Sequence, residues 1–113
     1  MEIKREDHNT YTTLAPQGDL DANSSIFLDE AIKELIQGNR FHIHVDCEDI
    51  PYISSAGLGV FISHLDEIKS QDGELIVSGP NQSVSDVFQL LGLDQLLTIL
   101  KDRKAVDDHF AAV

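Results

Sequence analysis

Apolar residues recur along this chain with two periods, one typical of helices and one typical of strands. Helical spacing predicts a helix from Ser24 or Ser25 to Gly38, a second from Ser54 or Ser55 to about Gly73, and a third that ends at Gly92. A weaker helix is predicted over residues 102–113. The residues expected to face inward are Leu28, Ala31, Ile32, Leu35 and Ile36, then Leu58, Phe61, Ile62, Leu65 and Ile68, then Val84, Val87, Phe88 and Leu91, and finally Val106, Phe110 and Val113.

Strand-like segments lie before and between these helices. Residues 3–17 read as two strands around a turn at His8 and Asn9, and residues 41–46, 74–78 and 96–100 read as three more. Helices and strands alternate after the opening hairpin, without repeats or linkers. This order predicts a single α/β domain over residues 1–113, with a mixed four- to five-stranded sheet and about four helices packed mainly on one face.

The segment Tyr52–Val60 places two serines and two glycines where an extended segment turns into the second helix. Ser54 and Ser55 fall at the helix start, where a serine oxygen caps free N–H groups and where an anion is favoured. Capping alone, a phosphate acceptor and a catalytic nucleophile are three interpretations of this pair. The nucleophile interpretation lacks a Gly-x-Ser-x-Gly elbow and needs a histidine brought in by folding.

The sequence gives weaker support to other candidate binding or catalytic sites. Gly57 and Gly59 lack the following lysine of a phosphate-binding loop, so they are interpreted as sites of close packing against a strand or a partner. His42 and His44 share one face of a strand and could hold a metal, but a partly exposed strand face is the preferred interpretation. Five carboxylates are likewise interpreted as a solvated rim rather than as the catalytic pair of a hydrolase. They are Asp19, Asp21, Asp46, Glu48 and Asp49. We therefore predict no catalytic residue and no metal site.

Composition narrows the class of partner. The net charge of −12, from 20 acidic and 8 basic residues, repels phosphate backbones and argues against nucleic-acid binding. It suits a basic protein partner, and it also serves solubility. No apolar run approaches membrane-span length, no signal-peptide core follows Met1, and Cys47 is the single cysteine. These features predict a cytoplasmic protein that does not bind membranes.

Three segments together resemble the STAS domain family, and in particular its bacterial anti-sigma factor antagonists, also called anti-anti-sigma factors. They are the run Ser55–Val60, the turn Gly18–Asp21, and Leu91-Gly92-Leu93 before the last predicted strand. The resemblance spans nearly the whole chain, and the order of elements agrees with it. It implies the STAS fold.

In that family the usual pattern is Asp-Ser-Ser/Thr-Gly-Leu-Gly, and a partner kinase phosphorylates its first serine. That acceptor falls on Ser55 here, with Ser54 as the alternative acceptor. Ala56 replaces the second hydroxyl residue, and Ser54 replaces the aspartate. Asp46 and Asp21 match acidic positions of the family. The partner-binding residues implied by the resemblance are Asp19, Asp21, Ser54, Ser55, Ala56, Gly57, Leu58 and Gly59.

The resemblance also implies a mechanism of partner switching in the regulation of transcription. The unphosphorylated protein binds an anti-sigma factor that is itself a serine kinase, and the sigma factor is released. Phosphorylation of Ser55 ends the binding, and a PP2C-type phosphatase resets the switch. The chain is then a substrate, not an enzyme; it needs no cofactor of its own, since ATP and Mg²⁺ belong to the kinase, and it is a monomer or weak dimer. The alternatives are a STAS scaffold or transporter-accessory subunit that is never phosphorylated, and an enzyme with Ser55 as nucleophile.

Overall fold

A five-stranded sheet with the order β1-β2-β3-β4-β5 forms the centre of the computed structural model, which describes residues 1–111. β1 (Glu2–Asp7) pairs antiparallel with β2 (Thr12–Gln17), as expected for the predicted hairpin. β3 (His42–Asp46), β4 (Glu74–Ser78) and β5 (Thr98–Leu100) then add in parallel. The mixed sheet is therefore confirmed, and the last predicted strand is present but short.

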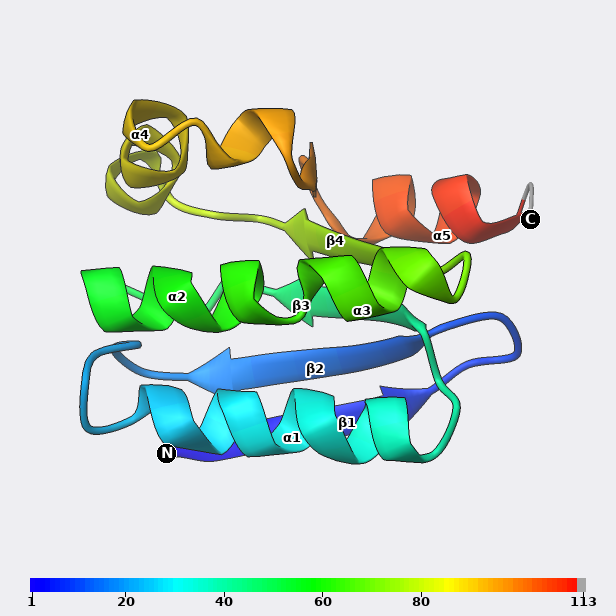
Figure 1. Ribbon diagram of the computed structural model, residues 1–113. Helices are drawn as coiled ribbons and strands as arrows, with labels where there is room; N and C mark the ends of the chain where they lie inside the picture. The colour runs from blue at the N-terminus through cyan, green and yellow to red at the C-terminus, as the bar shows by residue number, and fades with distance from the viewer. Residues whose placement is uncertain (112–113) are drawn as a thin grey trace.

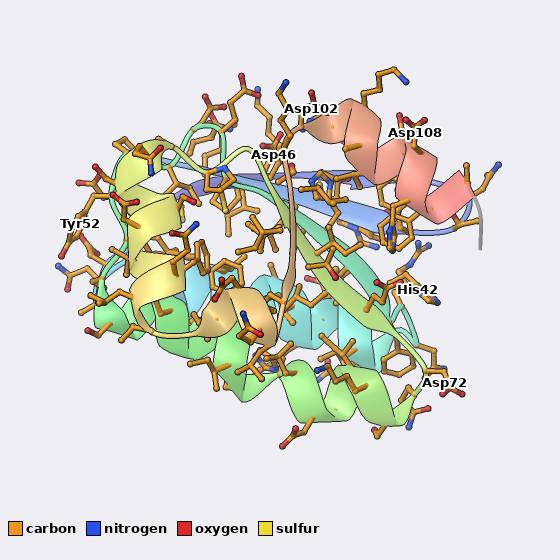
Figure 2. The ribbon with its side chains drawn as sticks, turned by 90° about the horizontal axis from the view of Figure 1, so that it is seen from above. His42, Asp46, Tyr52, Asp72, Asp102 and Asp108 are labelled. Atoms are coloured by element: carbon orange, nitrogen blue, oxygen red, sulfur yellow. The ribbon has the colours of Figure 1, made fainter. Side chains whose placement is uncertain are left out.

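Five α-helices surround this sheet. They are α1 (Ser25–Gln37), α2 (Ser55–Ser63), α3 (Leu65–Ser70), α4 (Gln82–Leu90) and α5 (Arg103–Ala111), with a short 3-10 helix, η1 (Leu93–Gln95), before β5. α1 and the α2–α3 pair lie side by side over one face of the sheet, whereas α5 lies on the opposite face (Figures 1 and 2). Val113, which was predicted to pack inward with Val106 and Phe110, lies outside the described residues. Within residues 1–111, no helix combines the length and apolar character that crossing a membrane requires.

Two apolar clusters of unequal size hold the layers together. The large one lies between the sheet and α1, α2, α3 and α4, and it includes the edge-to-face ring pair Phe61–Phe88. The small one lies under α5 and consists of Ile76, Val106 and Phe110, with Tyr11 and Leu100 packed against it. Burial of apolar area is the main driving force for folding, so the α1–α4 side carries most of the stabilisation.

The second predicted helix is interrupted. α2 ends at Ser63, with His64 as its C-cap, and α3 begins at Leu65, where one continuous helix was expected. His64 Nε2 lies 2.7 Å from Asp29 Oδ1 on α1, so this contact fixes the junction against the neighbouring helix. The predicted inward face was also partly wrong, because Ile62 is 47% exposed and Val60 is buried in its place.

The third helix shows a similar discrepancy at its end. Asn81 caps α4, with its Oδ1 accepting from the Val84 N–H at 2.8 Å. Leu91, predicted to face inward, is 55% exposed. It follows the last turn of α4 and precedes Gly92, whose φ of 72° ends the helix.

The middle strand β3 does not alternate between buried and exposed positions as its sequence suggests. Four of its five residues are buried, because helices cover both faces of the sheet. His44 was interpreted as partly exposed, but it is 1% exposed. Its Nδ1 lies 2.9 Å from Thr13 Oγ1 and its Nε2 lies 2.6 Å from Ser78 Oγ, so a hydrogen-bonded chain joins β2, β3 and β4. Burial lowers the pKa of His44 to about 4, which keeps the ring neutral at neutral pH.

Candidate functional site

The predicted site residues gather at the carboxyl-terminal edge of the parallel strands, where α1 and α2 begin (Figure 1). The loop after β2 and the segment before α2 are bonded to each other there. The Leu20 N–H donates to the Tyr52 carbonyl at 2.9 Å, and the Ser54 N–H donates to the Leu20 carbonyl at 2.9 Å. This parallel bridge between Leu20 and Ile53 brings together two segments more than thirty residues apart in the sequence.

Ser54 is the N-cap of α2. Its backbone is extended, and its Oγ accepts from the Gly57 N–H at 3.3 Å. Aspartate and serine cap helices about equally well. Ser54 therefore performs the local structural role that an aspartate would perform at this position, but without a negative charge.

Ser55 occupies the first position of α2, and its side chain is exposed, as is that of Ala56. The first turn of α2 contains no acidic residue. The first N–H groups of a helix lack intrahelical partners, and the helix dipole favours an anion beside them. Of the two serines, Ser55 is thus the one whose hydroxyl is presented to other molecules, and a phosphate there would meet a favourable local field.

The two glycines of this segment have opposite surroundings. A Cβ on Gly57 would lie 2.6 Å from the Leu20 carbonyl oxygen and 2.9 Å from Leu20 Cγ, so only glycine fits there. A Cβ on Gly59 would meet no atom within 4 Å. Packing within the described fold therefore accounts for Gly57, as expected from the sequence, but not for Gly59.

Two members of the predicted partner-binding set are buried in this structure. Leu58 is 2% exposed and belongs to the large apolar cluster, and Gly57 is covered by Leu20. Neither presents a surface to a partner, so the expectation of direct contact is corrected for both. They position α2 on the sheet, while Ser55, Ala56 and Gly59 remain exposed.

The aspartates of the first loop have distinct roles. Asp21 Oδ1 accepts from the backbone N–H groups of Asn23 at 2.9 Å and Ser24 at 3.1 Å, and these bonds lower the pKa of its carboxyl. The Ser24 hydroxyl donates to the Asp19 carbonyl at 2.6 Å, so Ser24 closes the loop and makes no side-chain cap of α1. Asp19 is exposed. The loop is thus held in shape by Asp21 and Ser24, with the Asp19 carboxylate left at the surface.

Asp46 does not belong to a solvated rim, which corrects the sequence interpretation. It is 6% exposed, and its Oδ2 accepts from Arg103 Nε at 2.7 Å. Arg103 also bonds Glu6 at 2.6 Å. Asp46 therefore anchors α5 on the opposite face of the sheet from α2.

The histidines of residues 1–111 make their described hydrogen bonds away from the serine pair. Those bonds reach Thr13, Ser78, Asp29 and Glu74, and none joins Ser54 or Ser55. In the same part of the chain, no three His, Cys, Asp or Glu side chains lie close enough to hold a metal ion. Burial raises the pKa of the Cys47 thiol, which disfavours a reactive thiolate.

Large apolar side chains are exposed beside the serine pair, and the sequence patterns did not single them out. Tyr52 is 55% exposed, and it projects from the end of the molecule in Figure 2. Ser55, Gly59 and Ile62 are spaced by four and three residues, which places them on one side of α2. No sequence signal marks Ile62 as an outward residue, because α2 is apolar around most of its circumference.

Comparisons of the sequence and of the structure with known proteins agree with one another. The family model described as STAS domain matches residues 2–106. An anti-sigma-B factor antagonist from Staphylococcus epidermidis is 24% identical over 99 residues, which cover 88% of this chain and 92% of that protein. A crystal structure from Thermotoga maritima has a TM-score of 0.91 at 21% identity, covering 96% of this chain and 94% of the other. The Bacillus cell fate determinant SpoIIAA in its phosphorylated form has a TM-score of 0.74 at 21% identity, covering 95% and 98%.

Proposed function

Because this chain belongs to the STAS domain family, we propose that it is an anti-sigma factor antagonist whose unphosphorylated form binds an anti-sigma factor serine kinase. Phosphorylation of Ser55 ends that binding. The single observation that supports the switch in this chain is the exposed Ser55 hydroxyl at the first position of α2. The neighbouring Ser54 caps the helix, and its backbone is hydrogen-bonded to the first loop at Leu20. Relatives named as antagonists support the class of function.

A phosphate on Ser55 would add enough charge to end the binding of the partner. It adds about −1.5 to −2 charge at neutral pH to a chain whose net charge is already −12. A charge left unpaired inside a complementary interface costs about 2–5 kcal/mol of binding free energy. That cost corresponds to a loss of affinity of roughly 30-fold to several thousand-fold.

Ser54 does not prevent this switch. The family's aspartate at this position is replaced by a residue that caps α2 equally well, so the geometry around Ser55 is retained. The change removes one negative charge next to the acceptor. We infer that the substitution affects which kinase recognises the segment more than whether Ser55 is presented.

In this proposal the chain is a ligand and a substrate, not an enzyme. The kinase brings ATP and Mg²⁺ to Ser55, and a PP2C-type phosphatase returns the protein to its binding form. The exposed end of α2 and the Asp19–Asp21 loop are the docking region. Leu58 and Gly57 contribute by holding α2 against Leu20 and the sheet.

The test is phosphate transfer in vitro. The protein is incubated with an anti-sigma kinase from the same genome, ATP and Mg²⁺, and its intact mass is measured. We expect a gain of one phosphate in the native protein and in Ser54→Ala, and no gain in Ser55→Ala. A gain that survives Ser55→Ala but is lost in Ser54→Ala moves the acceptor to Ser54. No gain with any such kinase, together with unchanged binding by Ser55→Asp, contradicts the switch and favours a scaffold or transporter-accessory role.

A further inference from the structure

A small cavity lies at the end of the molecule away from Ser55. The turn between β1 and β2 and the connection from α1 to β3 form its walls, and both lie at the opposite end from the start of α2 (Figure 1). Figure 2 likewise places His42, which lines the cavity, and Tyr52 at opposite ends of the molecule. The cavity has a volume of about 180 Å³, which is below the roughly 300–1,000 Å³ of pockets for drug-sized ligands. Its size therefore suits an ion or a very small molecule.

The wall of this cavity is rich in hydrogen-bond donors. Its polar residues include His8, Asn9, Thr10, Asn39, Arg40 and His42. Acidic residues make up 20 of the 113 residues of the chain, yet none of them is among the described residues that line the cavity. A wall with an arginine, many donors and no carboxylate favours an anion.

Arg40 supplies the permanent positive charge of the cavity. Its Nη1 donates to Thr12 Oγ1 at 3.3 Å, and its Nη2 lies 3.8 Å from Asp7 Oδ2. Asp7 is bound more closely by Arg5, whose Nε donates to Asp7 Oδ1 at 2.9 Å. The Arg40 guanidinium therefore keeps donors for a second acceptor, and its planar fork matches the oxygens of a phosphate or a carboxylate.

Two histidines add donors to the same wall. His8 Nε2 lies 3.1 Å from Thr13 Oγ1, which leaves its Nδ1 outside the described hydrogen bonds. Within residues 1–111, His42 Nδ1 is the one buried side-chain nitrogen or oxygen that has no hydrogen-bond partner. A buried N–H without an acceptor is unfavourable, so the neutral His42 ring carries its proton on Nε2. Each ring thus keeps one nitrogen that can donate to a ligand in the cavity.

Hydrogen bonds within the chain fix both walls of the cavity. The His8 N–H donates to the Tyr11 carbonyl at 2.9 Å across the β1–β2 turn, and the two rings stack with their centroids 4.3 Å apart. The Tyr11 hydroxyl donates to Asp107, so that carboxylate is also engaged. On the other wall the Arg40 N–H donates to the Leu35 carbonyl at 2.8 Å. Donors that are held in place before binding lose little conformational entropy when a ligand arrives.

We infer that this cavity binds a phosphate group, either as the free phosphate ion or as the phosphate of a small monoester, through Arg40, His8 and His42. A phosphate fits better than a carboxylate, because its additional oxygens accept from the guanidinium and from both rings at once. The inference does not depend on the proposed function, since the cavity lies at the opposite end of the molecule from Ser55 (Figures 1 and 2). Binding to the folded chain alone would also stabilise the fold.

The experiment titrates inorganic phosphate into the full-length chain at fixed pH and fixed ionic strength, and follows the histidine ring signals by NMR. The signals of His8 and His42 should shift together and saturate with one dissociation constant of about 1 mM or less. The ring of His64 is the internal control, because it is bonded to Asp29 at the junction of α2 and α3 and does not line the cavity. Ring signals of His8 and His42 that stay unchanged up to about 50 mM phosphate overturn the inference.

Glycerol 3-phosphate and acetate, titrated in the same way, identify the source of the anion. Tighter binding of glycerol 3-phosphate than of inorganic phosphate assigns the site to a monoester, whereas the reverse order assigns it to the free ion. Either order supports a phosphate site. Acetate binding that equals or exceeds both overturns the assignment to phosphate.

Two charge variants test the role of Arg40 in opposite directions. Arg40→Gln should weaken phosphate binding by about tenfold or more, because it removes the charge and the fork. Asp7→Asn should tighten binding by about threefold, because Arg40 then loses its competing carboxylate. A gain of affinity cannot be imitated by misfolding. Lys69→Gln and Asp66→Asn are the controls with the same changes of charge, since both residues are exposed on α3 and do not line the cavity; their affinities should stay within about twofold of the native value.

Thermal unfolding gives an independent measurement. Phosphate at about ten times its dissociation constant should raise the melting temperature by about 4–8 °C relative to chloride of the same ionic strength. Phosphate also stabilises folded proteins in general, because it is excluded from their surfaces. The specific part is therefore the rise that disappears in Arg40→Gln. An equal rise in the native protein and in Arg40→Gln, or equal phosphate affinities of the two, overturns the inference and leaves the proposed function untouched.

Discussion

The α5 face is rich in charged groups, whereas the exposed side of α2, with Tyr52, Ser55, Gly59 and Ile62, carries none, and we call this side the α2 surface. Three of the eight basic residues, Lys101, Arg103 and Lys104, line a cavity of about 550 Å³ beside α5, together with Asp46, Glu48 and Asp102. Arg103 bonds both Asp46 and Glu6, His109 bonds Glu74, and Tyr11 bonds Asp107. On the α2 surface Tyr52 and Ile62 are exposed, and residues 41–68 contain no lysine or arginine. Ion pairs and hydrogen bonds within the chain hold α5 against the sheet, whereas the α2 surface is exposed and largely apolar.

The difference teaches how this fold separates stability from recognition. Asp46 and Arg103, which hold α5 on the sheet, are paired, so changing them should alter the free energy of unfolding. Groups on the α2 surface are exposed and unpaired, so changing them should alter affinity and leave folding nearly intact.

The largest effect is expected from pH, through His44. Its pKa in the folded protein is about 4 because the ring is buried, against 6.5 in the unfolded chain. As pH falls below 6.5 the unfolded state binds a proton that the folded state refuses, so stability is lost down to about pH 4. At about 1.4 kcal/mol per pKa unit the loss approaches 3 kcal/mol. Urea unfolding of the native protein and of His44→Gln at pH 7, 5.5 and 4.5 measures it, and parallel curves for the two proteins would refute this origin.

Gly57→Ala should destabilise the protein by about 2–3 kcal/mol, because the new Cβ overlaps the Leu20 carbonyl and side chain. Gly59→Ala is the matched control two residues further along the same helix, and it should be stabilising by about 0.5–1 kcal/mol. Urea midpoints of the two variants have opposite signs of change if this assignment is right. Equal changes would mean that the two glycines are not distinguished by packing.

Arg103→Ala should destabilise by about 1–2 kcal/mol, because it leaves the buried Asp46 carboxylate without its cation and loosens α5. The arginine itself is 44% exposed, which keeps the loss below that of a fully buried pair. Lys104→Ala is the control, since its exposed pair with Asp108 is worth only a few tenths of a kcal/mol. Kinase binding should be unchanged in both variants, and a loss of affinity in Arg103→Ala alone would place α5 in the interface.

The sequence was sufficient for features that depend on local chemistry. The cap at Ser54, the hairpin around His8 and Asn9, and the end of α4 at Gly92 each follow from one or two residues, and each was predicted. The resemblance to the family added Ser55 and the first loop. Hydrogen bonds between Leu20 and the Tyr52–Ser54 segment then explain why these distant segments meet.

The features that sequence patterns missed depend on contacts between distant segments. Ile62 was assigned inward because α2 is apolar around most of its circumference, so a 3.6-residue period does not single out one face. His44 was taken as partly exposed because alternation in β3 cannot reveal that α5, sixty residues later, covers that face. Asp46 and Arg103 are 57 residues apart, and only folding shows that they pair.

The central claim is that the α2 surface binds a partner and that a phosphate on Ser55 ends the binding. The most direct measurement compares the affinity of the unphosphorylated protein with that of the protein phosphorylated at Ser55, both titrated into the same anti-sigma kinase under identical salt. We predict that the phosphorylated form binds roughly 30-fold to several thousand-fold more weakly. Equal affinities of the two forms would contradict the claim.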